Sequence, residues 1–176
     1  MSLMSLPTHI DLRRLAEQGA LLEGSMPLLQ MERLCASLLD VKQTDRVLAR
    51  FEFNKSQDGL YVMSAHIQAT LCLQCQRCME PMDFKVVVSP QFALVTTEQD
   101  MELLPLSYEP LWGTEGLVSL LATIEDELLL SLPIVPKHSE NCLPMILVDH
   151  IDLPIQAESP FSALVAVKDK LKKGSS

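Results

Sequence analysis

The sequence lacks the glycine-rich loops that hold phosphates in many enzymes, and it contains only six glycines in 176 residues. The patterns G-x-x-x-x-G-K-[ST], G-x-G-x-x-G and G-x-S-x-G do not occur, so a phosphate-cradling loop and a nucleophile elbow are unsupported. The consecutive carboxylates Glu125, Asp126 and Glu127 do not share a helix face. A general acid-base pair must face one substrate, so we expect these three to form a solvated face. The sequence therefore predicts a protein that is not an enzyme and has no small-molecule substrate.

Long apolar runs and an excess of positive charge are also missing. The apolar run that begins at Leu128 is broken by Pro133 and Pro136, and no run approaches the roughly 20 residues that span a bilayer. No basic region followed by an apolar core occurs at the N-terminus, so no signal peptide is expected. Five cysteines without a secretory signal indicate a reducing compartment and not a disulfide framework. The net charge of −9 disfavours a general nucleic-acid binder, because it repels a phosphate backbone.

The length of the chain predicts one domain over residues 1–176. Within it we expect an acidic connector at 97–116, an extended coil at 143–159 and a flexible basic tail at 168–176. Tyr108 and Trp112 are expected to pin the acidic connector to the core. The basic tail contains Lys168, Lys170, Lys172 and Lys173.

Alternation of apolar and polar residues predicts the centre of the fold. It runs through residues 47–53 and again through 61–73, and Asp58-Gly59 between them is a turn dipeptide. These segments predict an antiparallel hairpin with one wet face. A third alternating run covers 84–94, where Pro90 indicates an edge position or a bulge.

Helical spacing of apolar residues predicts helices near Pro27–Leu39, Leu117–Leu130 and Phe161–Leu171, with Ser25 as the N-cap of the first. Together with the alternating runs, they predict an α+β fold. In this fold an antiparallel β-meander packs with two or three helices.

Three of the five cysteines are clustered in the sequence CLQCQRC of residues 72–78. Cys72 belongs to the polar face of the second strand, whereas Cys75 and Cys78 lie where the chain must turn. A C-x-x-C pair on a tight turn supplies half of a tetrahedral metal site. The H-x3-C pair of His138 and Cys142 follows a later apolar run and could supply the other half. The hypothesis is a structural zinc site of Cys75, Cys78, His138 and Cys142, which requires the two loops to meet.

Other interpretations of the cysteines stay open. All five thiols could be reduced and without metal, or Cys75 and Cys78 could be a redox pair, although redox C-x-x-C motifs usually occupy a helix N-terminus in a βαβ unit. His150 is a weaker alternative ligand. We expect His66 to be a solvated strand residue.

Several motifs, in order and spacing, resemble the YceD family of large ribosomal RNA subunit accumulation proteins. These are LQCQRCMEP at 73–81, YEP at 108–110, IEDEL at 124–128, LPIVP at 132–136 followed by His138 and Cys142, and Pro160-Phe161 before a short basic helix. Some relatives carry cysteine in place of His138 and a further C-x-x-C beyond Cys142.

The resemblance implies a bacterial cytoplasmic accessory factor, without catalytic activity, that supports accumulation and maturation of 23S rRNA. Its partner would be the precursor of the large ribosomal subunit. Because the chain is acidic, we expect contact through ribosomal proteins, or with 23S rRNA through local patches such as Arg13–Arg14 and Lys168–Lys173. The alternative function is a metal-responsive or thiol-redox regulator that uses Cys75 and Cys78.

Overall fold

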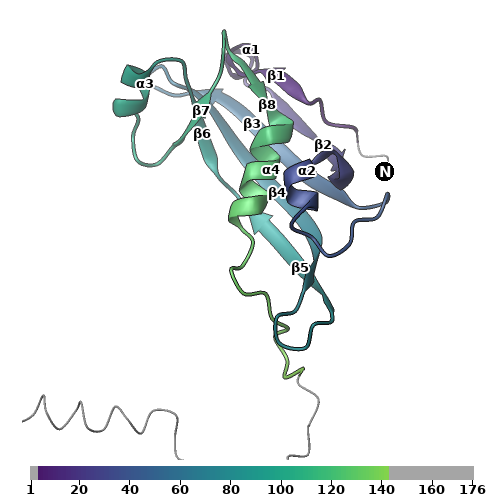
Figure 1. Cartoon of the computed structure of the whole chain (residues 1–176). Helices are drawn as coiled ribbons and strands as arrows, with labels where there is room; N and C mark the ends of the chain where they lie inside the picture. The colour runs from purple at the N-terminus through teal and green to yellow at the C-terminus, as the bar shows by residue number, and fades with distance from the viewer. Residues whose placement is uncertain (1–3, 143–176) are drawn as a thin grey trace, which may run out of the picture. The chain divides into compact units, whose positions relative to one another are not determined.

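The computed structural model of the chain describes residues 4–142. Within these residues there are a six-stranded sheet, a two-stranded sheet and four α-helices (Figure 1). The elements in chain order are β1 (His9–Asp11), α1 (Leu12–Glu17), β2 (Leu21–Pro27), the 3₁₀ helix η1 (Leu28–Gln30), α2 (Glu32–Cys35), β3 (Arg46–Lys55), β4 (Tyr61–Gln74), β5 (Pro81–Val88), β6 (Gln91–Val95), α3 (Glu98–Glu102), β7 (Glu109–Trp112), β8 (Leu117–Ser119) and α4 (Leu120–Leu130). The α+β fold class predicted from the sequence is confirmed.

The centre of the larger sheet is the antiparallel hairpin of β3 and β4. One face of this hairpin is buried, with Phe51 and Phe53 on β3 and Met63 and Ile67 on β4. Most residues that alternate with these on each strand are more exposed. Gly59 has φ +85°, a conformation that glycine adopts without steric cost at the turn. The predicted hairpin and its buried face are confirmed.

The long strand β4 pairs with two strands along one side. β5 lies antiparallel to its C-terminal half and β6 lies antiparallel to its N-terminal half. Pro90 separates the two, because proline has no N–H for the ladder, and its carbonyl oxygen accepts a hydrogen bond from the Ala65 amide at 3.0 Å. The predicted interruption at Pro90 is therefore present. Because of this interruption, β5 pairs only with the part of β4 that leads to the hairpin tip at residues 75–80.

Two strands that the sequence analysis did not predict complete the sheet. β2 pairs antiparallel with β3, and β7 pairs parallel with β6, so the order within residues 4–142 is β2-β3-β4-β6-β7 with β5 beside β4. The predicted N-cap role of Ser25 is wrong, because Ser25 lies in β2. Its hydroxyl oxygen accepts a hydrogen bond from Nε of Arg46 on the neighbouring strand at 2.8 Å.

Residues 97–116, predicted as a connector, contain α3 and β7. Thr97 and Asp100 form a capping box at the start of α3, in which each side chain accepts from the other residue's backbone N–H. Trp112 lies on β7 with 52% of its surface exposed, so the prediction that it pins this segment to the core is wrong. The hydrogen bonds of β7 to β6 hold the segment instead.

Helix α4 packs its apolar side onto the core. Leu120, Ile124 and Leu128 are fully buried at helical spacing, as predicted. The helix begins at Leu120 and not at Leu117, because Leu117–Ser119 forms β8, which pairs with β1. The Ser119 hydroxyl then accepts from the Ala122 amide and caps the helix. In Figure 1, α4 and α2 lie side by side over the sheet.

Glu125 of α4 joins the two helices. The helix predicted at Pro27–Leu39 is reduced to η1 and the single turn α2, whose N-cap position, Met31, has no side-chain acceptor. Glu125 Oε1 accepts instead from the backbone N–H of Arg33 at 2.7 Å and of Leu34 at 3.1 Å, and Oε2 pairs with the Arg33 guanidinium at 2.8 Å. Only 6% of Glu125 is exposed, so the predicted solvated face is wrong for this residue, although Asp126 beside it is exposed.

The extended coil at 143–159, the helix at Phe161–Leu171, the tail at 168–176 and His150 lie outside the described residues. Among residues 4–142, no helix is long and apolar enough to cross a membrane.

Candidate metal centre

The hairpin tip between β4 and β5 holds Cys75 and Cys78. The Cys75 amide donates to the Glu80 carbonyl at 3.0 Å, and the Met79 amide donates to the Cys75 carbonyl at 2.9 Å. Met79 has φ +64°, a left-handed conformation that reverses the chain within a few residues. The turn therefore places two thiols that are three residues apart on one side of the tip.

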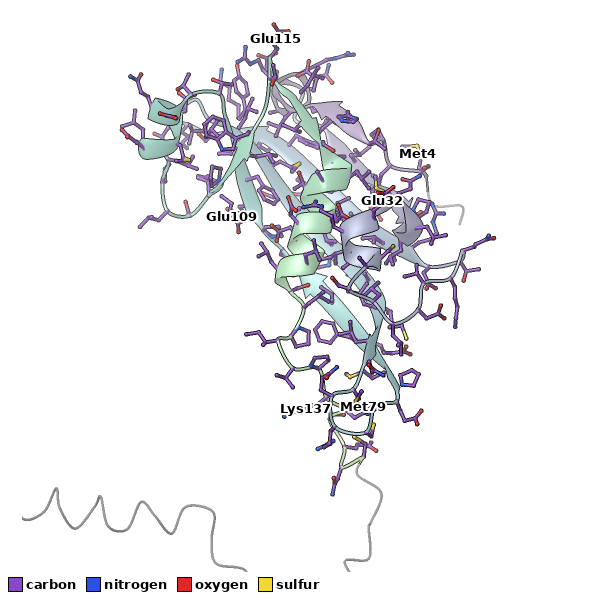
Figure 2. All side chains as sticks on the ribbon, viewed as in Figure 1. Met4, Glu32, Met79, Glu109, Glu115 and Lys137 are labelled. Atoms are coloured by element: carbon purple, nitrogen blue, oxygen red, sulfur yellow. The ribbon has the colours of Figure 1, made fainter. Side chains whose placement is uncertain are left out.

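The segment after α4 comes to the same tip. α4 ends at Leu130, and the chain beyond it runs along the hairpin to reach its end, where Figure 2 labels Lys137 beside Met79. One backbone hydrogen bond joins the segments, from the Gln76 amide to the Pro136 carbonyl at 2.8 Å. The loops that the sequence analysis required to meet are adjacent in the structure.

The four candidate side chains converge at this point. The ligand atoms of Cys75, Cys78, His138 and Cys142 all lie within 4.8 Å of one another. Cys75 Sγ lies 3.6 Å from Cys142 Sγ, and Cys78 Sγ lies 3.4 Å from His138 Nδ1. In a tetrahedral zinc site with the usual bond lengths, two sulfurs lie about 3.8 Å apart, and a sulfur and a nitrogen about 3.6 Å apart. The donor types are those of a zinc site, and these two distances are close to the spacings in such a site.

The orientation of His138 suits a ligand. Its Nε2 lies 3.2 Å from the Pro81 carbonyl oxygen. A carbonyl oxygen can only accept, so Nε2 carries the proton and Nδ1, which faces Cys78, has a lone pair for a metal. Metal-bound histidines usually donate their second N–H in this way.

Arg77, between the two cysteines of the tip, holds the second loop in place. Its Nε donates to Cys142 Sγ at 3.1 Å, and its guanidinium donates to the carbonyls of His138, at 3.1 Å, and Glu140. This role of Arg77 was not predicted from the sequence. Its position inside the C-x-x-C spacing was the available signal, because a residue there must lie at the tip.

The hairpin tip also favours thiolate. Burial raises the pKa of Cys75, but the backbone N–H groups of Cys78, His138 and Arg77 stabilise the anion and lower that pKa to about 5. Burial also raises the pKa of Cys142, but hydrogen bonds from Arg77, Cys78 and His138 together outweigh it, so the pKa lies below its usual value. Two of the three sulfurs are therefore disposed to lose their protons.

The other two ligands keep their protons more readily. The backbone N–H of Glu80 lowers the pKa of Cys78, but burial and the neighbouring sulfurs outweigh it and raise the pKa overall. Hydrogen bonds to the thiolates of Cys142 and Cys75 raise the pKa of His138. Metal binding must displace these protons.

Residues that the sequence analysis set aside lie apart from this group. Cys72 is on β4 opposite Asp40 and is not part of the group found among the described residues. His66 is exposed on the wet face of the sheet, where it bonds to Ser89 and Gln68.

The affinity of the site for zinc is expected to fall as pH falls. Between about pH 6 and pH 8 the Cys78 thiol, and the fraction of His138 that is protonated, must lose a proton on binding, whereas Cys75, with a pKa of about 5, is already ionised. Each displaced proton changes the apparent affinity about tenfold per pH unit, so the dependence steepens again near pH 5. Competition with a colorimetric zinc chelator between about pH 4.5 and pH 8 measures this. An affinity that does not change from pH 8 to pH 6 would contradict thiol ligation.

Comparison with known proteins identifies the family of the chain. The sequence profile of the family described as "Large ribosomal RNA subunit accumulation protein YceD" matches residues 63–168. A large ribosomal RNA subunit accumulation protein YceD from Haemophilus influenzae is 33% identical over 144 residues, which cover 81% of this chain and 82% of the relative. No solved structure matches the chain. From the profile match and the similarity over most of both lengths, we conclude that the chain belongs to the YceD family.

Proposed function

We propose that this protein is a non-enzymatic accessory factor in biogenesis of the large ribosomal subunit, which supports accumulation and maturation of 23S rRNA. The observation that carries the proposal is the 33% identity, over 81% of the chain, to a relative whose name states large ribosomal RNA subunit accumulation. That name specifies an RNA level and no reaction. The partner would be the precursor of the large subunit in the cytoplasm, met through its proteins or its RNA.

The Cys3His group would hold one structural zinc ion in this function. Four protein ligands close the coordination sphere, so zinc would have no open position for a substrate. Its contribution would be to join the hairpin tip to the segment at 136–142, which otherwise meet through a few hydrogen bonds. Such a clip would keep the far end of β4 and β5 in one shape for a partner.

A second candidate, a metal-responsive or thiol-redox regulator, is favoured by one observation. Cys75 has a pKa of about 5, and thiols with a low pKa are often reactive. Against it, Cys75 is fully buried, which limits access for an oxidant. Oxidation of the metal-free protein and mapping of any disulfide between Cys75 and Cys78 would separate the two candidates, because a redox regulator keeps its fold in both states.

Loss of this protein is expected to lower the level of large-subunit rRNA relative to small-subunit rRNA. In a strain without the gene, expression of the unaltered chain should restore the ratio, and Cys72→Ser should restore it as well. Cys75→Ser should recover less than about a tenth of the lost rRNA ratio, because a structural zinc site supplies folding free energy that this variant loses. Quantification of both rRNAs checks this. An unchanged ratio in the deletion strain would refute the proposed function.

A further inference from the structure

Residues 97–116, which we call the acidic segment, concentrate the charge of the protein. They carry five carboxylates and no lysine, arginine or histidine. These carboxylates are Glu98, Asp100, Glu102, Glu109 and Glu115. The chain as a whole has a net charge of −9, so this short stretch accounts for more than half of it. Its field attracts cations and repels phosphate groups.

The same segment exposes large apolar side chains. Leu103 is 83% exposed, Leu106 is fully exposed, and Trp112 and Met101 are about half exposed. In Figure 1, α3 and the loop after it project from the side of the sheet where β6 and β7 lie. Within residues 4–142, β7 is the last strand of the order, so its outer edge is not paired. Large apolar side chains exposed near an open edge, on a segment rich in carboxylates, are typical of an interaction site.

A hollow of about 500 Å³ adjoins the segment. It is lined by Asp100, Leu103 and Pro105 of the segment, by 58–60 of the β3–β4 turn and by Tyr61 at the start of β4. The Arg13 guanidinium, the cation that lines the hollow, lies over the Tyr61 ring at 5.4 Å. The carboxylate of Asp100 accepts hydrogen bonds from Thr96 and Thr97, and Asp58 also lines the hollow. Lys55 Nζ lies over the same Tyr61 ring at 5.2 Å, so the hollow combines apolar side chains with both carboxylates and cations.

We infer that the acidic segment and this hollow form a docking surface for a cationic segment of a partner protein, which inserts an aliphatic or aromatic side chain into the hollow. Charge complementarity selects this occupant, because five carboxylates attract lysine and arginine and oppose an RNA backbone. The identity of the partner rests on the proposed function: ribosomal proteins are, as a class, basic. The buried anchor would supply affinity and the carboxylates would supply association rate and specificity.

The full-length protein and a fluorescein-labelled, lysine-rich peptide with one tryptophan provide the test. Fluorescence anisotropy should show binding that weakens with salt. The triple variant Glu102→Gln, Glu109→Gln and Glu115→Gln should bind the peptide at least about tenfold more weakly. Equal binding by this variant overturns the inference.

A matched control removes three carboxylates elsewhere. Glu23→Gln, Asp40→Asn and Asp83→Asn make the same change in net charge on exposed residues outside the acidic segment. This variant should bind within about twofold of the unaltered protein, because the effect is local. An equal loss in both variants would mean that net charge alone attracts the peptide, and it would overturn the inference.

The apolar part of the surface is tested in the same way. Leu103→Ser with Leu106→Ser should weaken binding about tenfold, whereas Leu29→Ser with Leu130→Ser, at exposed positions elsewhere, should not. A peptide with serine in place of tryptophan should bind the unaltered protein and the Leu103→Ser, Leu106→Ser variant equally well. Circular dichroism of each variant checks that the fold is retained.

Other occupants give distinct outcomes, and each overturns the inference. Direct binding of labelled, protein-free large-subunit rRNA to the protein, lost in the triple charge variant, would show that the surface binds RNA. Tighter peptide binding by a full-length variant with Lys168, Lys170, Lys172 and Lys173 changed to Gln would show that the surface belongs to the protein's own basic tail. Self-association lost in the Leu103→Ser, Leu106→Ser variant would indicate a second copy.

The proposed function is tested separately from the surface. If the charge variant loses the peptide but fully restores the rRNA ratio in the deletion strain, this surface is not the partner site, and the accessory function stands. If deletion of the gene leaves the rRNA ratio unchanged, the proposed function fails whether or not the peptide binds.

Discussion

Replacing Cys75 by serine is expected to release zinc and to unfold the hairpin tip while the sheet remains. A structural zinc site contributes about 10–16 kcal/mol to small zinc-finger peptides, and here that free energy would act on the tip and on residues 136–142. The core beneath β3 and β4 does not depend on the site, because Phe51, Phe53 and Ile67 are fully buried among other apolar residues. The variant should therefore lose structure at one end only.

Hydrogen exchange measures this directly. The amides of Gln76 and Met79 donate to Pro136 and Cys75 in the folded tip and should lose protection in the variant by at least about a hundredfold, whereas the amides of β3 should be unchanged. Cys72→Ser is the matched control, since its position on β4 contributes nothing to the group. Retained protection at Gln76 in the Cys75→Ser protein would show that zinc does not hold the tip.

Glu125→Ala is expected to lower the free energy of unfolding by about 2–3 kcal/mol. The Glu125 side chain is 8% exposed, and its removal leaves the N–H groups of Arg33 and Leu34 without the acceptors that the structure shows. A buried donor without a partner costs about 1–3 kcal/mol, and α2 loses the capping group that Met31 cannot replace. In a protein of this size the midpoint of thermal unfolding should fall by roughly 4–12 °C.

Asp126→Ala provides the comparison within the same cluster. Asp126 also pairs with Arg33, at 2.7 Å, but both side chains are more than half exposed, and exposed ion pairs stabilise little. The midpoint of the Asp126→Ala variant should stay close to that of the unaltered protein. The midpoint of the Glu125→Gln variant should lie between those of Asp126→Ala and Glu125→Ala. Equal effects of Glu125→Ala and Asp126→Ala would mean that charge, and not capping, stabilises α2.

The same contact has a pH signature. Burial raises the pKa of Glu125, but the Leu34 amide and the Arg33 guanidinium outweigh burial, so the pKa lies below the usual 4.5. A lowered pKa means that the folded state binds the proton less tightly than the unfolded state. The stabilisation is therefore present above about pH 4.5 and is lost as pH falls through the lower value of the folded protein.

Local patterns in the sequence were sufficient to predict the central hairpin. Residues with a period of two, such as Phe51 and Ile67, can bury one face only as strands, and Asp58-Gly59 specified the turn between them. The core positions of α4 followed from its helical spacing in the same way. These predictions depend on neighbours within a few residues, and that is why they were correct.

Contacts between distant segments were not predictable from the same patterns. The pairing of β2 depends on residues of β3 that lie 19 to 31 positions away, and the pairing of β7 on residues of β6 that lie 17 positions away. Glu125 looked like part of a solvated run until its partner, 91 residues away on α2, was known. Propensity within a short window carries no information on such partners, and tertiary pairing overrides it.

The candidate metal centre depends partly on local patterns and partly on contacts between distant segments. The alternation of β4 separated Cys72 from Cys75 and Cys78, and the ligand count required a second loop. The chemistry of the residues suggested His138 and Cys142, whereas the contribution of Arg77 depends on its reach across the tip to three atoms of that loop. Spacing can thus nominate ligands, but the groups that orient them follow from the three-dimensional arrangement.

X-ray absorption at the zinc edge of the natively purified, full-length protein tests the zinc clip most directly. Ligation by Cys75, Cys78, Cys142 and His138 predicts about one zinc per chain, with three sulfurs at about 2.3 Å and one nitrogen at about 2.0 Å. A protein that carries no zinc, or zinc surrounded only by oxygen and nitrogen, would contradict it.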